Sequence, residues 1–211
     1  MYNLTYIMKN VRIKLIKEEH RPIVFELLSK LKAHSKESFV HSIDVADKSL
    51  ALARVLGIRG VHLERLYVAS LLHDVGKVYV DESILHNSNT TEEEREYIRV
   101  VHIEGTRSIL SEYFDEELVD LAAHHHERLN SSGYPMHLNA KKLGLLDRVL
   151  QVADVTSALE MSRCYKDAYA PEQVIEILDK LVSRGELDKR CVREIERLFL
   201  KPIRDKSQMS S

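Results

Sequence analysis

The spacing of apolar residues is the feature that most restricts the fold of this chain, because it follows a helical period along nearly the whole sequence. One stripe on a single helical face consists of Ile43, Ala46, Leu50, Ala53 and Leu56. Gly57 follows this stripe as a predicted helix stop. With only 7 glycines and 4 prolines in 211 residues, few turns can interrupt such helices. The sequence therefore predicts an all-α fold.

Capping residues mark where several predicted helices begin. Thr91 is a predicted N-cap followed by three glutamates, Asp115 and Asp188 are predicted N-caps, and Pro171 suits a first helical turn. The predicted helices cover residues 22–32, 61–72, 91–113, 115–125, 145–161, 171–181 and 188–200. Residues 10–17 alternate apolar with basic side chains, which allows a short strand, although a lone strand would have no partner.

Length and composition are typical of one globular domain with short additions. We expect an N-terminal extension at residues 1–34, one helical domain at 35–205 and a flexible tail at 206–211. The formal net charge of −2 argues against long nucleic acid as a partner, and no run approaches the ~18 apolar residues of a membrane span. Two cysteines without a secretion signal favour a reducing, cytoplasmic location.

Histidines and aspartates at the ends or interiors of apolar helices predict metal chemistry. His73-Asp74 ends the predicted buried helix 61–72, and Asp154 lies in the apolar run 149–159, where a carboxylate needs a partner or a metal. His41 or His102 alone would more often be an ordinary surface or core residue. Together with the His124-His125-His126 run, however, these groups predict a site for two or more divalent ions that hydrolyses a phosphate ester. Imidazole and carboxylate suit iron, manganese or zinc, and the lack of thiolate pairs argues against structural zinc.

The order of these motifs is itself informative. They are His41-Ser42, His73-Asp74-Val75-Gly76-Lys77, His102 with Gly105, the run His125-His126-Glu127-Arg128-Leu129-Asn130-Ser131-Ser132-Gly133-Tyr134-Pro135, then Asp154 and Arg163-Cys164-Tyr165-Lys166. Over about residues 35–200 this order resembles the HD-GYP branch of the HD-domain metal-dependent phosphohydrolases. The resemblance implies a helical bundle with a di- or trinuclear metal site. It also implies hydrolysis of cyclic di-GMP, a bacterial second messenger, or of a related cyclic dinucleotide, by a metal-bridging hydroxide.

The resemblance also implies a role for each matching residue. The metal-ligand positions are His41, His73, Asp74, His102, His125, His126 and Asp154. Asp74 matches the carboxylate that bridges two metals, and the expected cofactors are two or three divalent ions, iron or manganese. Glu37 precedes His41 by one helical turn and matches the extra ligand of three-metal members, although a solvated glutamate is the alternative. Lys77, Arg163 and Lys166 match phosphate-binding positions, with surface lysine and arginine as the alternative, and Tyr134 matches the tyrosine of the Gly-Tyr-Pro segment near the bound nucleotide. Asp74 and Lys77 are the expected catalytic residues, since Lys77 would also stabilise charge in the transition state.

The chain departs from the family pattern at two places. Asn130-Ser131 stands where the family usually has Asp-Gly, and Cys164 stands where proline is usual. These changes put in question the substrate choice and the docking of a cyclic di-GMP synthase on the Gly-Tyr-Pro loop. Two other functions stay open, namely an HD phosphohydrolase for another nucleotide or phosphate ester, and a non-catalytic cyclic-dinucleotide-binding module. The complete set of ligand positions argues against the binding module.

Overall fold

The computed structural model describes residues 11–85, 87, 89–161 and 168–200. Its α-helices are α2 (Arg21–His34), α3 (Lys36–Val55), α4 (Gly60–Leu72), α5 (Glu82–Leu85), α6 (Glu92–Leu110), α7 (Glu116–Ala123), α8 (Leu145–Glu160), α9 (Pro171–Ser183) and α10 (Lys189–Ile195). Short 3₁₀ turns are η1 (Ile13–Leu15), η2 (Glu18–His20), η3 (Val75–Tyr79) and η4 (His124–His126), and a π-helical turn η5 (Glu196–Leu200) extends α10. The described residues form no strand, which confirms the all-α prediction.

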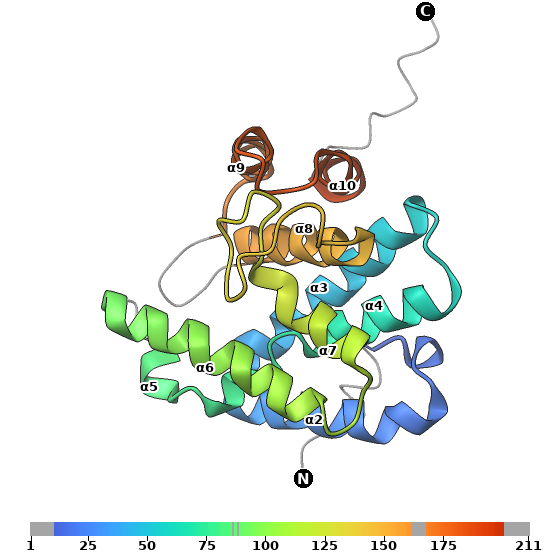
Figure 1. Cartoon of the computed structure of the whole chain (residues 1–211), viewed down its shortest axis with the longest axis vertical. Helices are drawn as coiled ribbons and strands as arrows, with labels where there is room; N and C mark the ends of the chain where they lie inside the picture. Colours follow the sequence, from blue (N-terminus) through green and yellow to red (C-terminus); the bar gives the residue numbers. More distant parts are fainter. Residues whose placement is uncertain (1–10, 86, 88, 162–167, 201–211) are drawn as a thin grey trace, which may run out of the picture.

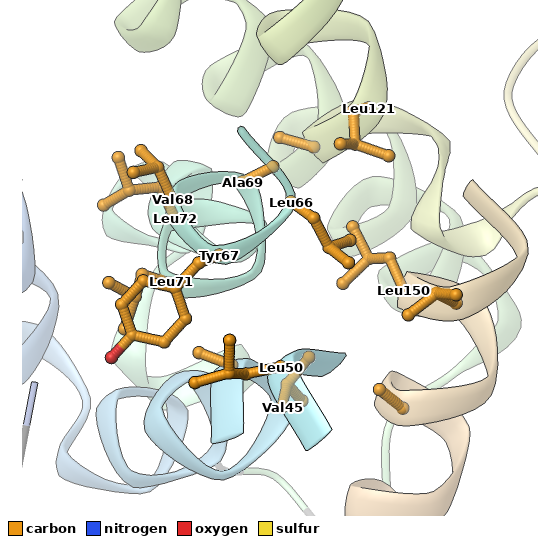
Figure 2. Close-up of a cluster of buried hydrophobic side chains, with 14 of the residues drawn as sticks. Val45, Leu50, Leu66, Tyr67, Val68, Ala69, Leu71, Leu72, Leu121 and Leu150 are labelled. Atoms are coloured by element: carbon orange, nitrogen blue, oxygen red, sulfur yellow. The ribbon is translucent and has the colours of Figure 1, made fainter. Parts of the chain in front are cut away.

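The helices pack around a core in which α4 is central. In Figure 1, α9 and α10 lie together at one end of the molecule, α8 crosses beneath them, and α2 and α6 lie toward the other end. Figure 2 shows Leu66 and Leu72 of α4 in a cluster of buried side chains that includes Leu50 of α3, Leu121 of α7 and Leu150 of α8. The four helices that share this core also carry or adjoin most of the predicted site residues.

The predicted capping residues form the expected hydrogen bonds. Thr91 Oγ1 accepts from Glu94 N while the Glu94 carboxylate accepts from Thr91 N, which is a complete capping box. Asp115 and Asp188 likewise accept backbone N–H groups at the starts of α7 and α10. The helix after Thr91 ends at Leu110 rather than at residue 113, and α7 ends at Ala123, before the histidine run turns into η4.

The N-terminal part of the chain belongs to the same core. Residues 11–17 do not form the short strand that their alternation allowed, since no neighbouring strand is available for pairing. Val11 and Ile16 are instead buried, and α2 buries Val24, Leu28 and Leu31 in the common hydrophobic cluster. Within the described chain, α2 therefore packs in the same core as the helices that follow residue 35. The predicted tail at 206–211 lies outside the described residues.

Among the described helices, none combines the length and the apolar character needed to cross a membrane.

Candidate active site

Five separate chain segments bring the predicted histidines and aspartates together. His41 lies on α3, the His73-Asp74 pair follows the last turn of α4, and His102 lies on α6. The other three are His125 and His126 in η4 and Asp154 on α8. Each segment is anchored by its own helix, so the packing of α3, α4, α6, α7 and α8 determines the relative positions of the side chains.

Asp74 lies at the centre of one half of this cluster. Its Oδ1 atom is 3.0 Å from His102 Nε2, 3.6 Å from His73 Nε2 and 3.9 Å from His125 Nε2. Its other oxygen, Oδ2, accepts a hydrogen bond from Lys77 Nζ at 2.5 Å. One buried carboxylate is thus surrounded by three imidazoles and one ammonium group, as a ligand shared by neighbouring cations would be.

Asp154 joins the remaining histidines to the cluster. Its Oδ1 accepts a hydrogen bond from His41 Nε2 at 2.9 Å and lies 3.7 Å from His73 Nε2. Its Oδ2 is 4.0 Å from His126 Nδ1. Ser157, one turn later on α8, places its Oγ 2.9 Å from His41 Nδ1 and so orients that ring from the other side.

Buried imidazole nitrogens make the cluster suitable for metal ions. His73 Nδ1 donates to the Ser70 carbonyl at 2.8 Å, and His125 Nδ1 donates to the Ala122 carbonyl at 2.6 Å. Since a carbonyl only accepts, each neutral ring carries its lone pair on Nε2, which faces the carboxylates. The Nε2 atoms of His73 and His125 are buried and have no hydrogen-bond partner, while His102 Nε2 lies 3.0 Å from Asp74 Oδ1. Nitrogen and oxygen donors of this kind fit divalent metal ions, whose histidine ligands are usually oriented by such backbone carbonyls.

The charge states of the cluster follow from its burial. Burial lowers the pKa of His73 and lowers that of His125 well below its ordinary value, so both rings stay neutral. Burial by itself raises the pKa of Asp74, but the Lys77 ammonium and the nearby imidazoles outweigh it and hold that pKa well below its usual range. Neutral imidazoles and ionised carboxylates are the forms that bind metal ions.

The cluster opens into a cavity of about 400 Å³. Its described lining consists of His41, Asp74, Lys77, Ile98, His102, His126, Arg128, Tyr134, Asp154, Val155, Ala158 and Leu159. One wall is therefore polar and cationic, and another, from α6 and α8, is apolar. The Tyr134 ring lies 4.7 Å from the His126 ring between centroids, and Arg99 Cζ lies 5.7 Å from the centre of the tyrosine ring.

Two glycines allow the segment after Asp74 to approach α6 closely. A Cβ atom on Gly76 would lie 2.1 Å from the His102 carbonyl oxygen and 2.3 Å from Thr106 N. A Cβ atom on Gly105 would lie 2.7 Å from a Tyr79 ring carbon and 3.0 Å from the Gly76 oxygen. The sequence suggested a tight turn at Gly76, whereas the structure shows that its role is close packing of η3 against α6.

The other residues that the sequence analysis singled out do not line the described part of the cavity. Glu37 is half-buried on α3, one turn before His41, and is not among the described residues that line the cavity. His124 lies outside the cluster and pairs with Asp147, 3.0 Å away. Arg163 and Lys166 lie outside the described residues.

The sequence analysis assigned no role to three residues that line the cavity or hold its parts in place. Arg128 lines the cavity while its Nη1 donates to the carbonyls of His125 and Glu127. Ser157 orients His41, and Glu127 is fully buried and accepts two backbone N–H groups of the following loop. Arg128 was visible as a cation beside predicted ligands, but the serine carries no sequence signal beyond its helical register with Asp154.

The Asn130-Ser131 departure has a structural consequence. Ser131 adopts a φ of 66°, the left-handed region that glycine occupies without strain. Asn130 Oδ1 accepts from Ser132 N and Oγ, and its Nδ2 donates to the Arg184 carbonyl at 3.0 Å. A carboxylate at position 130 would have no hydrogen to donate to Arg184, so asparagine adds a link between this loop and the end of α9.

Comparisons with known proteins connect this geometry to a family. A curated relative, 3'3'-cGAMP-specific phosphodiesterase 1 of Vibrio cholerae, is 34% identical over 186 residues, which cover 87% of this chain and 43% of that protein. A cyclic di-GMP phosphodiesterase of Pseudomonas aeruginosa is 33% identical over 150 residues, covering 70% of this chain and 36% of that protein. The chain thus spans less than half the length of these relatives.

Solved structures with low sequence identity share the fold. An HDG"Y"P protein from Bdellovibrio bacteriovorus superposes with a TM-score of 0.62 at 19% identity, over 75% of this chain and 51% of that one. The HD domain of the L. monocytogenes phosphodiesterase PgpH, in complex with cyclic-di-AMP, gives a TM-score of 0.58 at 18% identity, over 84% and 99% of the two chains. The family model for the HD domain matches residues 18–191 and so begins before the boundary at residue 35. With this match over most of its length and the His73-Asp74 pair at the centre of its site, the chain belongs to the HD-domain family.

Proposed function

We propose that this chain is a metal-dependent phosphodiesterase of the HD-GYP branch that hydrolyses cyclic di-GMP or a related cyclic dinucleotide. The observation that carries the proposal is the pair of buried Nε2 atoms on His73 and His125, which lack hydrogen-bond partners and face the carboxylates of Asp74 and Asp154. Leaving such polar atoms unpaired is costly in a folded protein, and metal ligation offsets that cost.

The ligand atoms fall into two groups that support binding of two ions. His41, His73 and Asp74 form one group, and His102, His125 and His126 form the other, with the ligand atoms of each within 4.8 Å of one another. Such donors suit iron, manganese or zinc, and the resemblance to the HD-GYP branch favours iron or manganese among them. Glu37 would supply a ligand to a third ion from the turn before His41. Bound divalent ions would neutralise the phosphodiester oxygens and lower the pKa of water toward neutrality.

The side chains around these groups would bind and orient the substrate. Lys77 and Arg128 place positive charge at the cavity, where they would hold phosphate oxygens by charge-assisted hydrogen bonds. Arg163 and Lys166 are proposed as further phosphate anchors. Tyr134 and the apolar wall at Val155 and Leu159 suit the ribose and base of a nucleotide better than a fully charged ligand. A cyclic dinucleotide combines these features, and the names of the curated relatives support cyclic di-GMP and 3'3'-cGAMP as candidates.

The decisive experiment is anaerobic purification, metal analysis and a product assay on a panel of cyclic dinucleotides. We expect two or three iron or manganese ions per chain and conversion of at least one cyclic dinucleotide, with loss of activity after chelation and recovery after metal is returned. A Glu37→Ala variant tests the third ion, because it should lower the metal stoichiometry by one. A metal-free protein that binds cyclic dinucleotides without cleaving them would establish the binding module instead.

A second activity is favoured by one observation. The loop that carries Tyr134 has Asn130, whose Nδ2 donates to the Arg184 carbonyl, a bond that the aspartate of the usual family pattern cannot make, so the shape of the loop can differ from that pattern. If the wild type ignores cyclic dinucleotides but cleaves another phosphate ester with the same metals, an altered Tyr134 position becomes the explanation to test. Docking of a cyclic di-GMP synthase on this loop is also proposed, with the exposed Met136 as its contact.

A further inference from the structure

Glu127 directly follows two predicted metal ligands, yet its carboxylate is used elsewhere. The residue is fully buried, with 0% of its surface exposed. Its Oε1 accepts a hydrogen bond from Met136 N at 2.6 Å, and its Oε2 accepts one from Leu138 N at 2.8 Å. Both oxygens therefore bind the backbone of the segment 128–139, which we call the Tyr134 loop. A buried carboxylate is costly unless it is fully hydrogen-bonded, so this arrangement gives Glu127 a defined partner.

The Tyr134 loop also packs closely against the backbone of residues 126–128. Tyr134 N donates to the His126 carbonyl at 3.2 Å. A Cβ atom on Gly133 would lie 2.4 Å from both Glu127 Cα and Arg128 N, so only glycine permits this approach. The residue between the two N–H donors, His137, has a φ of 53°, a conformation that a non-glycine residue holds only where its surroundings require it.

The position of the Tyr134 ring depends on these contacts. The ring lines the cavity, lies 4.7 Å from the His126 ring and is approached from outside by Arg99. It reaches this place from a loop and not from a helix, so no helical hydrogen bonds hold its backbone. The two charge-assisted hydrogen bonds to Glu127 are the strongest described restraint on the chain just after it.

We propose that Glu127 is a positioning residue that holds the Tyr134 loop over the metal cluster and so sets substrate binding without ligating metal. The inference rests on the proposed function, since it assigns the loop to the substrate side of the same site. It predicts two different roles within the motif His125-His126-Glu127. The two histidine side chains face the carboxylates of the cluster, and the Glu127 side chain faces the loop.

The Glu127→Gln variant tests this assignment. Glutamine keeps one acceptor, but its amide group would face the other backbone N–H, so one charged hydrogen bond becomes a donor-to-donor contact. We expect unchanged metal content, a rise in KM for cyclic di-GMP of roughly tenfold or more, and a smaller change in kcat. Hydrogen exchange of peptides covering residues 133–139 should become faster, while peptides of α3 and α6 keep wild-type rates.

Two further variants make the test specific. Asp147→Asn is the matched control, because Asp147 also accepts a backbone N–H, from Gly144 at 2.8 Å, but does not touch the Tyr134 loop. It should leave both KM and exchange of residues 133–139 unchanged. In a Tyr134→Ala background, Glu127→Gln should add little further loss, because both changes remove the same positioned ring.

The outcomes separate the two proposals. Loss of metal in Glu127→Gln, unchanged exchange at residues 133–139, or fully additive losses with Tyr134→Ala would overturn the positioning role. Absence of any cyclic-dinucleotide hydrolysis by the wild type would overturn the proposed function alone, and hydrogen exchange together with metal content would still decide whether Glu127 holds the loop.

Discussion

The His/Asp cluster and the Tyr134 loop meet at one cavity but are built in different ways. The cluster stands on α3, α4, α6, η4 and α8, and its side chains are oriented by backbone carbonyls and by each other. The loop has one isolated bridge, between Asn130 and Asn139, scattered backbone hydrogen bonds such as that from Tyr134 N to the His126 carbonyl, and two backbone N–H groups that donate to the Glu127 carboxylate. In the proposed function, the metal-binding groups would therefore be held by helix packing, while the substrate contact of Tyr134 would be held by a loop.

The largest expected effect comes from removing the shared carboxylate of the cluster. Asp74→Ala should eliminate most bound metal and all measurable hydrolysis, because Asp74 approaches three histidines at once. The helical circular dichroism spectrum should persist. His124→Ala is the control, since this side chain pairs with Asp147 and should keep metal and most activity. Normal metal content in Asp74→Ala would mean that the cluster is not the metal site.

Lowering the pH should reduce the stability of the metal-free protein through the histidines of the cluster. Burial lowers the pKa of His73 and His125, so below the ordinary value of 6.5 the unfolded chain binds protons that the folded chain does not. Stability of chelated protein should therefore be full above about pH 7 and fall as the pH drops toward 5, by up to ~1.4 kcal/mol per pH unit for each histidine. The Asp74 carboxyl, with its lowered pKa, stabilises the folded state above about pH 4, and this stabilisation should be lost only as the pH falls below that value.

Urea denaturation of the chelated protein between pH 7.5 and 5 measures this effect. A midpoint that does not move over this range would contradict the assignment of neutral, buried rings.

A smaller effect is expected from the proposed phosphate anchors. Arg163→Ala and Lys166→Ala should each leave metal content unchanged and lower kcat/KM for cyclic di-GMP by roughly 10- to 150-fold, because a hydrogen bond to a charged group contributes ~1.5–3 kcal/mol. Arg95→Ala is the control, since Arg95 is an exposed partner of Glu92 on α6. Steady-state kinetics that are unchanged in both variants would show that the two cations are ordinary surface residues.

The smallest effect concerns the backbone of the loop itself. Ser131→Gly should raise the stability of the protein by a few tenths to about 1 kcal/mol, because glycine removes the cost of a left-handed φ of 66° but adds freedom to the unfolded chain. Calorimetric Tm of metal-loaded protein measures it. Ser132→Gly should lower Tm instead, since it removes the hydroxyl that donates to Asn130. A lower Tm for Ser131→Gly would show that the serine side chain contributes more than its backbone strain costs.

The sequence by itself determined the helices and the chemistry of the site, because both are local properties. Thr91, Asp115 and Asp188 cap helices through bonds to residues two or three positions away, and apolar periodicity is visible within a few turns. Histidines and aspartates in apolar surroundings predicted a metal site without any knowledge of the distances between them. A pattern such as residues 10–17, which is too short to distinguish a strand from an irregular segment, was the point where local reasoning did not suffice.

Only the tertiary structure decided which of these groups meet. His41 and Asp154 are 113 positions apart and become hydrogen-bonded because α3 packs against α8. Glu37, only four positions before His41, is absent from the described lining of the cavity. Glu127, next to two predicted ligands, points to the loop instead. Such outcomes depend on how distant helices pack and on which buried polar atoms must then find partners, and neither is encoded in any short stretch of the chain.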